Sequence, residues 1–128
     1  MDLKIGLKNS VAQVVTESDT AVAVGSGSLK VLATPKLIAL IEKAAADLTE
    51  KNLSPELTSV GISVNFEHTA PTPVGMNFSA EVEIIEIDGR KIIFNVSAFD
   101  EVGEIGRGKH ERFIVNREKF QSKADSKK

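Results

Sequence analysis

Residues 34–48 read TPKLIALIEKAAADL and carry the strongest signal for the architecture of the protein. The apolar side chains of this stretch recur every three or four residues, which is the spacing of one buried helical face, while its charged residues gather on the other side. Thr34 is placed to cap the helix, and Pro35 falls at the first helical position, where its missing N–H costs nothing. The pattern predicts one long helix, which Asn52 and Pro55 should end.

Apolar runs and apolar–polar alternation, both typical of β-strands, flank this helix on each side. Asp88-Gly89 predicts a tight hairpin turn, because both residue types tolerate positive φ. The βαβα order of a parallel sheet is absent, so we expect an α+β fold in which one long helix packs on a curved antiparallel sheet. The expected strands cover residues 11–15, 21–24, 60–68, 78–84, 92–98 and 109–115.

Length and charge restrict the class of protein. The 128 residues suit a single domain, expected over residues 1–120, with a polar and frayed tail over 121–128. Lys and Arg number 16 against 18 Asp and Glu, so the chain has no broad basic surface for a nucleic acid. No apolar run approaches the ~20 residues that span a bilayer, and none resembles a signal peptide. We therefore expect a cytoplasmic protein that does not engage a membrane.

Several kinds of chemistry are excluded by residue type. The chain has no cysteine, which rules out disulfides and thiolate nucleophiles. Two histidines without an HExxH or DxDxDG pattern predict no metal site. The GxSxG motif of α/β-hydrolases is missing, and Gly25-Ser26-Gly27-Ser28 satisfies neither common phosphate-loop pattern. This segment is interpreted as a flexible connection.

Three polar residues differ from their surroundings, and each has a structural alternative. Glu42 lies beside Ile38 and Ala45 on the predicted helix, where a carboxylate can act as a base or nucleophile or simply reach water. His68 ends a strand before two prolines and is either a proton carrier or an ordinary hydrogen-bonded residue. The Thr34 hydroxyl can bind a water or a substrate oxygen at the helix start, although the sequence alone favours the cap.

Gly61 occupies a strand position, where a missing side chain lets a ligand approach the backbone. A β-bulge or tight packing explains a glycine there equally well.

Three strings occur together in this order: ATPKLIALIE over residues 33–42, SVGISVNFEHTAPTPVG over 59–75 and IGRGKHER over 105–112. The set resembles the hotdog-fold thioesterases, specifically the fluoroacetyl-CoA thioesterase-like branch, across residues 11–120. The resemblance implies a long helix wrapped by an antiparallel sheet, with two subunits pairing to make the sites. Carried onto this sequence, it places the catalytic residues at Thr34, Glu42 and His68, and substrate contacts at the Gly61 backbone and Arg112.

The resemblance therefore implies a homodimeric acyl-CoA thioesterase that hydrolyses a small acyl thioester to the free acid and CoA. CoA would be part of the substrate, and no separate cofactor is expected. The segment before the helix, residues 26–32, lacks the aromatic lid of the fluoroacetyl-specific enzyme, which favours a broader acyl range. A non-catalytic acyl-CoA-binding module is the main alternative, and a hotdog dehydratase is a third. Whether Glu42 acts as nucleophile or as general base stays open.

Overall fold

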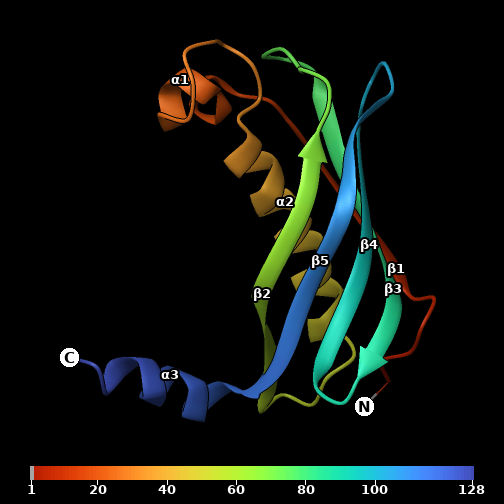
Figure 1. Ribbon diagram of the computed structural model, residues 1–128, viewed down its shortest axis with the longest axis vertical. Coiled ribbons are helices and arrows are strands. Elements are labelled where there is room, and N and C mark those ends of the chain that lie inside the picture. The colour runs from red at the N-terminus through yellow and green to blue at the C-terminus, as the bar shows by residue number, and fades with distance from the viewer. Residues whose placement is uncertain (1) are drawn as a thin grey trace.

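One long helix lies against one face of a single sheet in the computed structural model, which describes residues 2–128 (Figure 1). The strands are β1 (Lys8–Val14), β2 (Leu57–His68), β3 (Asn77–Asp88), β4 (Lys91–Asp100) and β5 (Glu104–Asn116). The helices are the 3-10 turn η1 (Glu17–Asp19), the short α1 (Ala21–Val24), the long α2 (Thr34–Glu50) and the C-terminal α3 (Arg117–Asp125). This element order confirms the predicted α+β class and the predicted long helix.

The sheet is antiparallel, with the strand order β1-β3-β4-β5-β2. β3 and β4 form the predicted hairpin, with Asp88 paired to Lys91 and the turn made by Gly89 and Arg90, one residue later than expected. Gly89 has a φ of 61°, in the left-handed region that glycine adopts most readily. The order leaves β1 and β2 at the two edges of the sheet.

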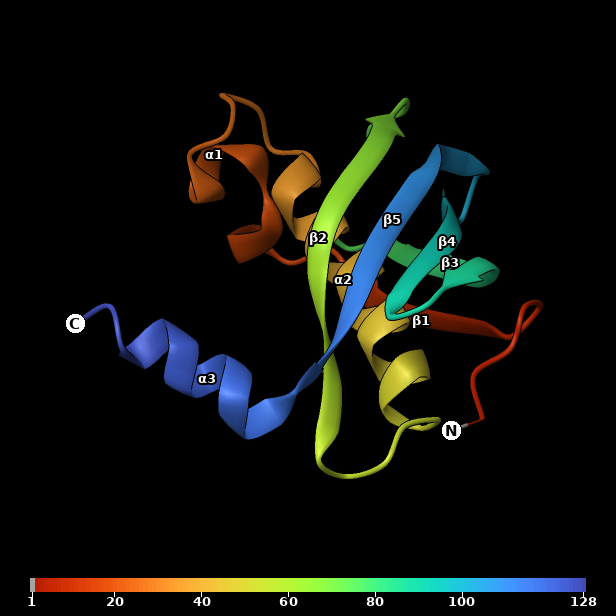
Figure 2. The ribbon, with the colours of Figure 1, turned by 60° about the horizontal axis from the view of Figure 1, so that its bottom comes forward.

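The hydrophobic core lies between α2 and the inner face of the curved sheet (Figures 1 and 2). The predicted apolar face of α2 supplies one side of it, and alternate residues of β3 and β4 supply the other. Burying each large aliphatic or aromatic side chain stabilises the fold by roughly 1.5–3 kcal/mol. Fully buried core residues include Leu37, Ile41, Ala44, Ala45, Ile84, Ile92 and Phe94.

A register shift in β2 reverses which of its residues face α2. The pairing of β2 with β5 slips at Ile62, which is left without a partner in the ladder. Gly61 faces α2 before the shift, and Val64, paired with the fully buried His110, faces inward after it. The expectation that residues 60–66 alternate along one face is therefore wrong, because the bulge inserts one residue into a period of two.

Ala21–Val24 forms the short helix α1 and not the strand predicted for it. Thr20 caps this helix by accepting a hydrogen bond from the Ala23 N–H at 3.3 Å. Gly25 ends it with a φ of 88°. The prediction failed because a short apolar run cannot be assigned to helix or strand by periodicity alone.

The polar C-terminal segment forms α3, where a frayed tail was expected from residue 121. Asn116 caps the start of α3 by accepting a hydrogen bond from the Lys119 N–H at 3.0 Å. The Arg117 guanidinium then ties the helix to the body of the protein by pairing with Glu50. A local cap and one tertiary ion pair therefore order a segment whose composition suggested fraying.

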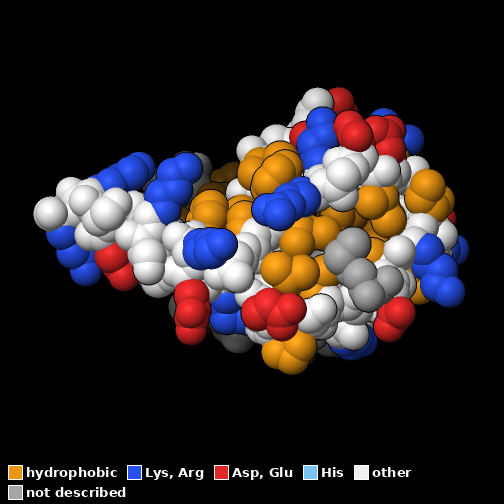
Figure 3. Space-filling view, turned by 90° about the horizontal axis from the view of Figure 1, so that it is seen from below, with side chains coloured by type: hydrophobic (Ala, Val, Ile, Leu, Met, Phe, Trp, Pro, Cys, Tyr) orange, Lys and Arg blue, Asp and Glu red, His pale blue; other side chains and the backbone are white. Residues whose placement is uncertain are grey.

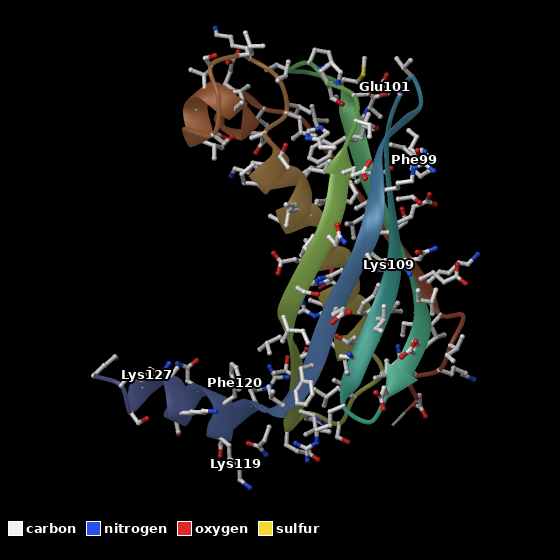
Figure 4. The ribbon with its side chains drawn as sticks, viewed as in Figure 1. Phe99, Glu101, Lys109, Lys119, Phe120 and Lys127 are labelled. Atoms are coloured by element: carbon white, nitrogen blue, oxygen red, sulfur yellow. The ribbon has the colours of Figure 1, made fainter. Side chains whose placement is uncertain are left out.

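Beyond its first turn, α3 projects away from the sheet (Figures 1 and 2). Figure 4 shows Lys119, Phe120 and Lys127 carried along this projection. In the view from below, the surface of α3 shows more Lys and Arg side chains than acidic ones (Figure 3). Within residues 2–128, no helix combines the length and the apolar character needed to cross a bilayer.

Candidate active site

Thr34 and His68 are brought together where α2 starts and β2 ends. Thr34 Oγ1 and His68 Nδ1 lie 2.7 Å apart and share a hydrogen bond. The cap residue of α2 is Ala33, whose carbonyl oxygen accepts hydrogen bonds from the N–H groups of Lys36 and Leu37. The predicted capping role of Thr34 is therefore wrong: its hydroxyl turns to the histidine and not to the backbone of the first helical turn.

The His68 ring keeps one nitrogen free. Its Nε2 is buried and has no hydrogen-bond partner among residues 2–128. Burial lowers the pKa of His68 from its ordinary value of 6.5, and the nearby backbone of Ala70 partly opposes this decrease. The ring is therefore neutral near pH 7, and its free nitrogen remains available to a ligand or a water.

A shallow cavity of about 290 Å³ adjoins the Thr34–His68 pair. It lies between α1, the start of α2 and the loop that follows β2. Apart from Thr34 and His68, its walls are formed by small or aliphatic side chains. The lining residues are Ala21, Ser26, Val31, Leu32, Thr34, His68, Thr69, Ala70 and Pro71.

Glu42 lies two turns further along α2, about 12 Å from Thr34 at 1.5 Å per residue. It is half-buried and faces Gly61 on β2. A Cβ placed on Gly61 would lie 2.8 Å from Glu42 Oε2, 3.2 Å from His110 Cε1 and 3.4 Å from Arg112 Nη1. The glycine therefore allows the carboxylate to approach the strand, and both structural alternatives for it, tight packing and an adjacent bulge, are present.

Arg112 is the buried cation of this second cluster, with 6% of its surface exposed. Its Nε donates to Ser59 Oγ at 2.8 Å, and its Nη2 donates to the Ser59 carbonyl oxygen at 2.9 Å. Its Nη1 lies 3.2 Å from His110 Nε2. Burial lowers the pKa of the guanidinium, while the carboxylates of Glu42 and Glu50 oppose that decrease.

The five predicted site residues thus form two clusters within one chain. Thr34 and His68 make the first, and Glu42, Gly61 and Arg112 make the second. Six residues of β2 lie between Gly61 and His68, which corresponds to about 20 Å of strand. Within residues 2–128, no three His, Asp or Glu side chains lie close enough to hold a metal ion.

Sequence reasoning missed three residues that the second cluster contains. Ser59, Thr49 and His110 are buried around Arg112. His110 was visible in the IGRGKHER string, two residues before Arg112 and therefore on the same face of a strand. Ser59 and Thr49 lie in different elements, and the sequence carries no signal that their hydroxyls meet.

The comparisons with known proteins agree with this architecture. Over residues 15–118 the chain matches the family FlK, described as fluoroacetyl-CoA-specific thioesterase. It is also similar to the fluoroacetyl-CoA thioesterase of Streptantibioticus cattleyicolor, with 37% identity over 98 residues that cover 77% of this chain and 70% of that enzyme.

Solved structures extend the likeness over the full chain. That of the fluoroacetyl-CoA thioesterase FlK superposes with a TM-score of 0.94 at 30% identity, covering 100% of this chain and 99% of that one. A threonine-to-serine variant of FlK, solved in complex with acetyl-CoA, gives a TM-score of 0.92 at 30% identity and covers 98% of each chain.

A Thermus thermophilus member of the thioesterase superfamily shares the fold at 22% identity, with a TM-score of 0.90 over 98% of this chain and 94% of that one. The expected hotdog fold is therefore confirmed, with a 17-residue helix packed against a five-stranded antiparallel sheet. On the family match, the identity and the shared architecture together, the chain belongs to the fluoroacetyl-CoA-specific thioesterase family, a family of thioester hydrolases within the hotdog superfamily.

Proposed function

We propose that this protein hydrolyses a small acyl-CoA thioester to the free acid and CoA. Thr34, Glu42 and His68 act as the catalytic residues, and the Gly61 backbone and Arg112 contact the substrate. The observation that carries the proposal is the free, buried Nε2 of His68 beside a cavity, in a ring that Thr34 holds through its other nitrogen. Family membership and the acetyl-CoA complex of the FlK variant support the substrate class.

The two clusters of one chain are half-sites that a second copy completes. β2 is an edge strand, and its bulged Ile62 is 50% exposed, so its outer side is open to another strand. When two copies of one strand pair antiparallel about a two-fold axis, the residue numbers of each facing pair add up to the same value. An axis between Val64 and Asn65 would therefore set His68 opposite the partner's Gly61. That register brings the partner's carboxylate cluster to the Thr34–His68 cavity.

In the joined site an oxygen atom of water or of the Glu42 carboxylate attacks the thioester carbonyl carbon, and a tetrahedral oxyanion forms. Glu42 acts as the base that takes a proton from the attacking water, or as the nucleophile that forms an acyl-enzyme which water then hydrolyses. The C–S bond then breaks, and the CoA thiolate takes up, through His68, the proton that Glu42 and His68 accept from water, so that CoA leaves as a thiol. The Gly61 N–H and the Arg112 guanidinium stabilise the oxyanion, an effect worth about 3 kcal/mol per donor in comparable sites. Thr34 orients the ring of His68 or the attacking water.

The acyl group that this site accepts is short and not restricted to a fluorinated one. Residues 26–32 contain no aromatic side chain, and the cavity walls from Ala21, Val31 and Ala70 are small. One missing contact in an apolar pocket changes discrimination only about 10- to 200-fold, so related short acyl groups should be turned over together.

Free-thiol release from acyl-CoAs of increasing chain length, run beside a binding titration, tests the proposal. We expect thiol release to be fastest for short acyl groups and to fall as the chain outgrows the cavity. Binding of acyl-CoA without thiol release would instead identify a non-catalytic acyl-CoA-binding module. Molecular mass in solution tests the pairing: a catalytically competent monomer would contradict the shared site.

A further inference from the structure

The interface between α2 and the sheet contains a cluster of buried polar side chains in an otherwise apolar layer. Thr49 and His110 are 0% exposed, Arg112 6% and Ser59 7%. They come from α2, β5 and β2, so the cluster joins three elements. Buried polar groups persist only where they are hydrogen-bonded, and here each one has a partner.

The directions of the hydrogen bonds can be assigned from donor and acceptor chemistry. Thr49 Oγ1 donates its single proton to the Ala46 carbonyl oxygen at 2.9 Å. The 2.8 Å hydrogen bond between Thr49 and Ser59 is therefore donated by Ser59 Oγ. Ser59 Oγ in turn accepts from Arg112 Nε. One chain of donors thus runs from the guanidinium to a carbonyl of α2.

His110 fixes the other side of the guanidinium. Its Nδ1 lies 2.8 Å from the Ser63 carbonyl oxygen, which can only accept, so Nδ1 carries the ring proton. Nε2 is left with a lone pair that accepts a proton from Arg112 Nη1. The ring also stacks on Phe94, with centroids 6.0 Å apart and an interplanar angle of 25°. His110 is therefore held as a neutral acceptor.

The cluster ends on the part of α2 that carries Glu42. Ala46 is one helical turn beyond Glu42, and Thr49 is two turns beyond it, on the same side of the helix. Even so, none of the ion pairs within residues 2–128 joins Arg112 to Glu42. A buried guanidinium beside a carboxylate would ordinarily close into a direct pair, because each charge compensates the burial of the other.

We propose that Thr49, Ser59 and His110 are positioning residues that hold the Arg112 guanidinium short of Glu42. Both charged groups then keep free hydrogen-bonding capacity for the substrate in the gap at Gly61. The inference rests on the proposed thioesterase function and adds three residues to its site. If the hydroxyl chain is broken, the guanidinium loses one anchor and can swing onto the carboxylate, which would occupy the groups that the reaction needs.

The sharpest test compares Thr49→Val, which keeps the shape of the side chain but removes the hydroxyl, with Thr49→Ser, which keeps the hydroxyl but removes a methyl group. We expect Thr49→Val to lower kcat by roughly 10- to 100-fold with a smaller change in KM, because a misplacement of about 1 Å has effects of that size. Thr49→Ser should restore most of kcat. A packing role would give the reverse order, since the serine variant leaves the larger cavity.

Thr58→Val is the matched control, because Thr58 precedes Ser59 on β2 and its hydroxyl donates to the exposed Glu50 side chain. This variant should match the wild type in kcat, and melting temperatures verify that all three variants are folded. Absence of thiol release from the wild type would overturn the proposed function and this inference together. Equal kcat values for Thr49→Val and Thr49→Ser beside an active wild type would overturn this inference alone.

A second readout does not depend on turnover. The ring nitrogens of His110, followed by NMR in uniformly ¹⁵N-labelled protein, should report the neutral tautomer with the proton on Nδ1 throughout the range from pH 6 to 8. The charged groups around this ring are Arg112, Glu42 and Glu111. A proton on Nε2, or an imidazolium form at pH 7, would overturn the proposal, because Nε2 could then not accept from Arg112.

Discussion

The two polar clusters along α2 use their hydrogen-bonding capacity in different ways. At the start of the helix, exposed Thr34 and half-buried His68 share one hydrogen bond, and His68 Nε2 has no partner within residues 2–128. Two turns later, the groups around Arg112 are buried and hydrogen-bonded to one another. An open pair can exchange protons with a ligand, whereas the hydrogen-bonded network around Arg112 sets positions. The comparison suggests that Thr34 and His68 handle protons, and that the buried network fixes the geometry of the groups beside Glu42.

The largest expected effect is on turnover, from Glu42→Gln. This change keeps the shape of the side chain but removes the base or nucleophile, so kcat should fall by roughly 10²-fold or more. Initial rates of thiol release from a short acyl-CoA measure it. Asp47→Asn on the same helix is the control, because the Asp47 carboxylate accepts a hydrogen bond from Lys43 at the surface, away from the site. Equal rates for Glu42→Gln and the wild type would remove Glu42 from the reaction.

The next largest effects are expected from alanine substitutions at two glycines, one of which should lower activity and the other stability. In Gly61→Ala the new Cβ meets Glu42 Oε2, the end of a flexible side chain, and less closely His110 Cε1 and Arg112 Nη1. The carboxylate therefore moves, and kcat should fall about tenfold or more, with a smaller loss of stability than at a glycine packed against backbone atoms. In Gly108→Ala the new Cβ meets the Asn65 carbonyl oxygen and the Phe66 Cα, which are backbone atoms. That variant should lose about 1–3 kcal/mol of unfolding free energy.

Urea unfolding and thiol release, both measured on the two variants, test this contrast. Should Gly61→Ala be the less stable of the two and the more active, the assignment of Gly61 to the site and Gly108 to the fold would be reversed.

A smaller effect is expected from pH. Burial lowers the pKa of both His68 and His110 from 6.5, so the unfolded chain binds more protons than the folded one as pH falls past that value. The free energy of unfolding should therefore decrease from about pH 7.5 to 5.5. Lowered carboxyl pKa values at Asp19, Glu50 and Asp100 act only at lower pH, near their ordinary values of 3.8 and 4.5.

Urea titrations between about pH 5.5 and 7.5 measure how steeply the free energy of unfolding changes with pH. His68→Gln should flatten it in part, because His110 remains. A slope that His68→Gln leaves unaltered would show that the open cluster does not contribute to the pH dependence.

The smallest effect is on the stability of Thr34→Val. Because Ala33 caps α2 and Thr34 is exposed, loss of this hydroxyl should change the free energy of unfolding by no more than about 0.5 kcal/mol. A helix cap would have cost about 1 kcal/mol, and the buried hydroxyl of Thr49 should cost about 1–3 kcal/mol. Denaturant unfolding of Thr34→Val and Thr49→Val compares the two clusters directly; equal losses would mean that Thr34 is a structural residue.

Local signals predicted the parts of the fold that local energetics decide. The periodicity of residues 34–48 predicted α2, which extends from Thr34 to Glu50. A long amphipathic pattern of this kind can bury all its apolar side chains only as one face of a helix. The same reasoning failed at Ala21–Val24, where four apolar residues fit either period. It also failed along β2, since the bulge at Ile62 is set by pairing with β5 and leaves no mark in the alternation.

For the candidate site, the sequence determined which residues are present and the family to which they belong. The positions of Thr34, Glu42, His68, Gly61 and Arg112 follow from motifs and their order along the chain. Tertiary contacts alone explain why Thr34 bonds His68 instead of its own helix, and why Ser59, Thr49 and His110 surround Arg112. The physical reason is that a hydroxyl or imidazole takes whichever partner the packing brings within about 3 Å, and contacts between distant segments have no periodic signature.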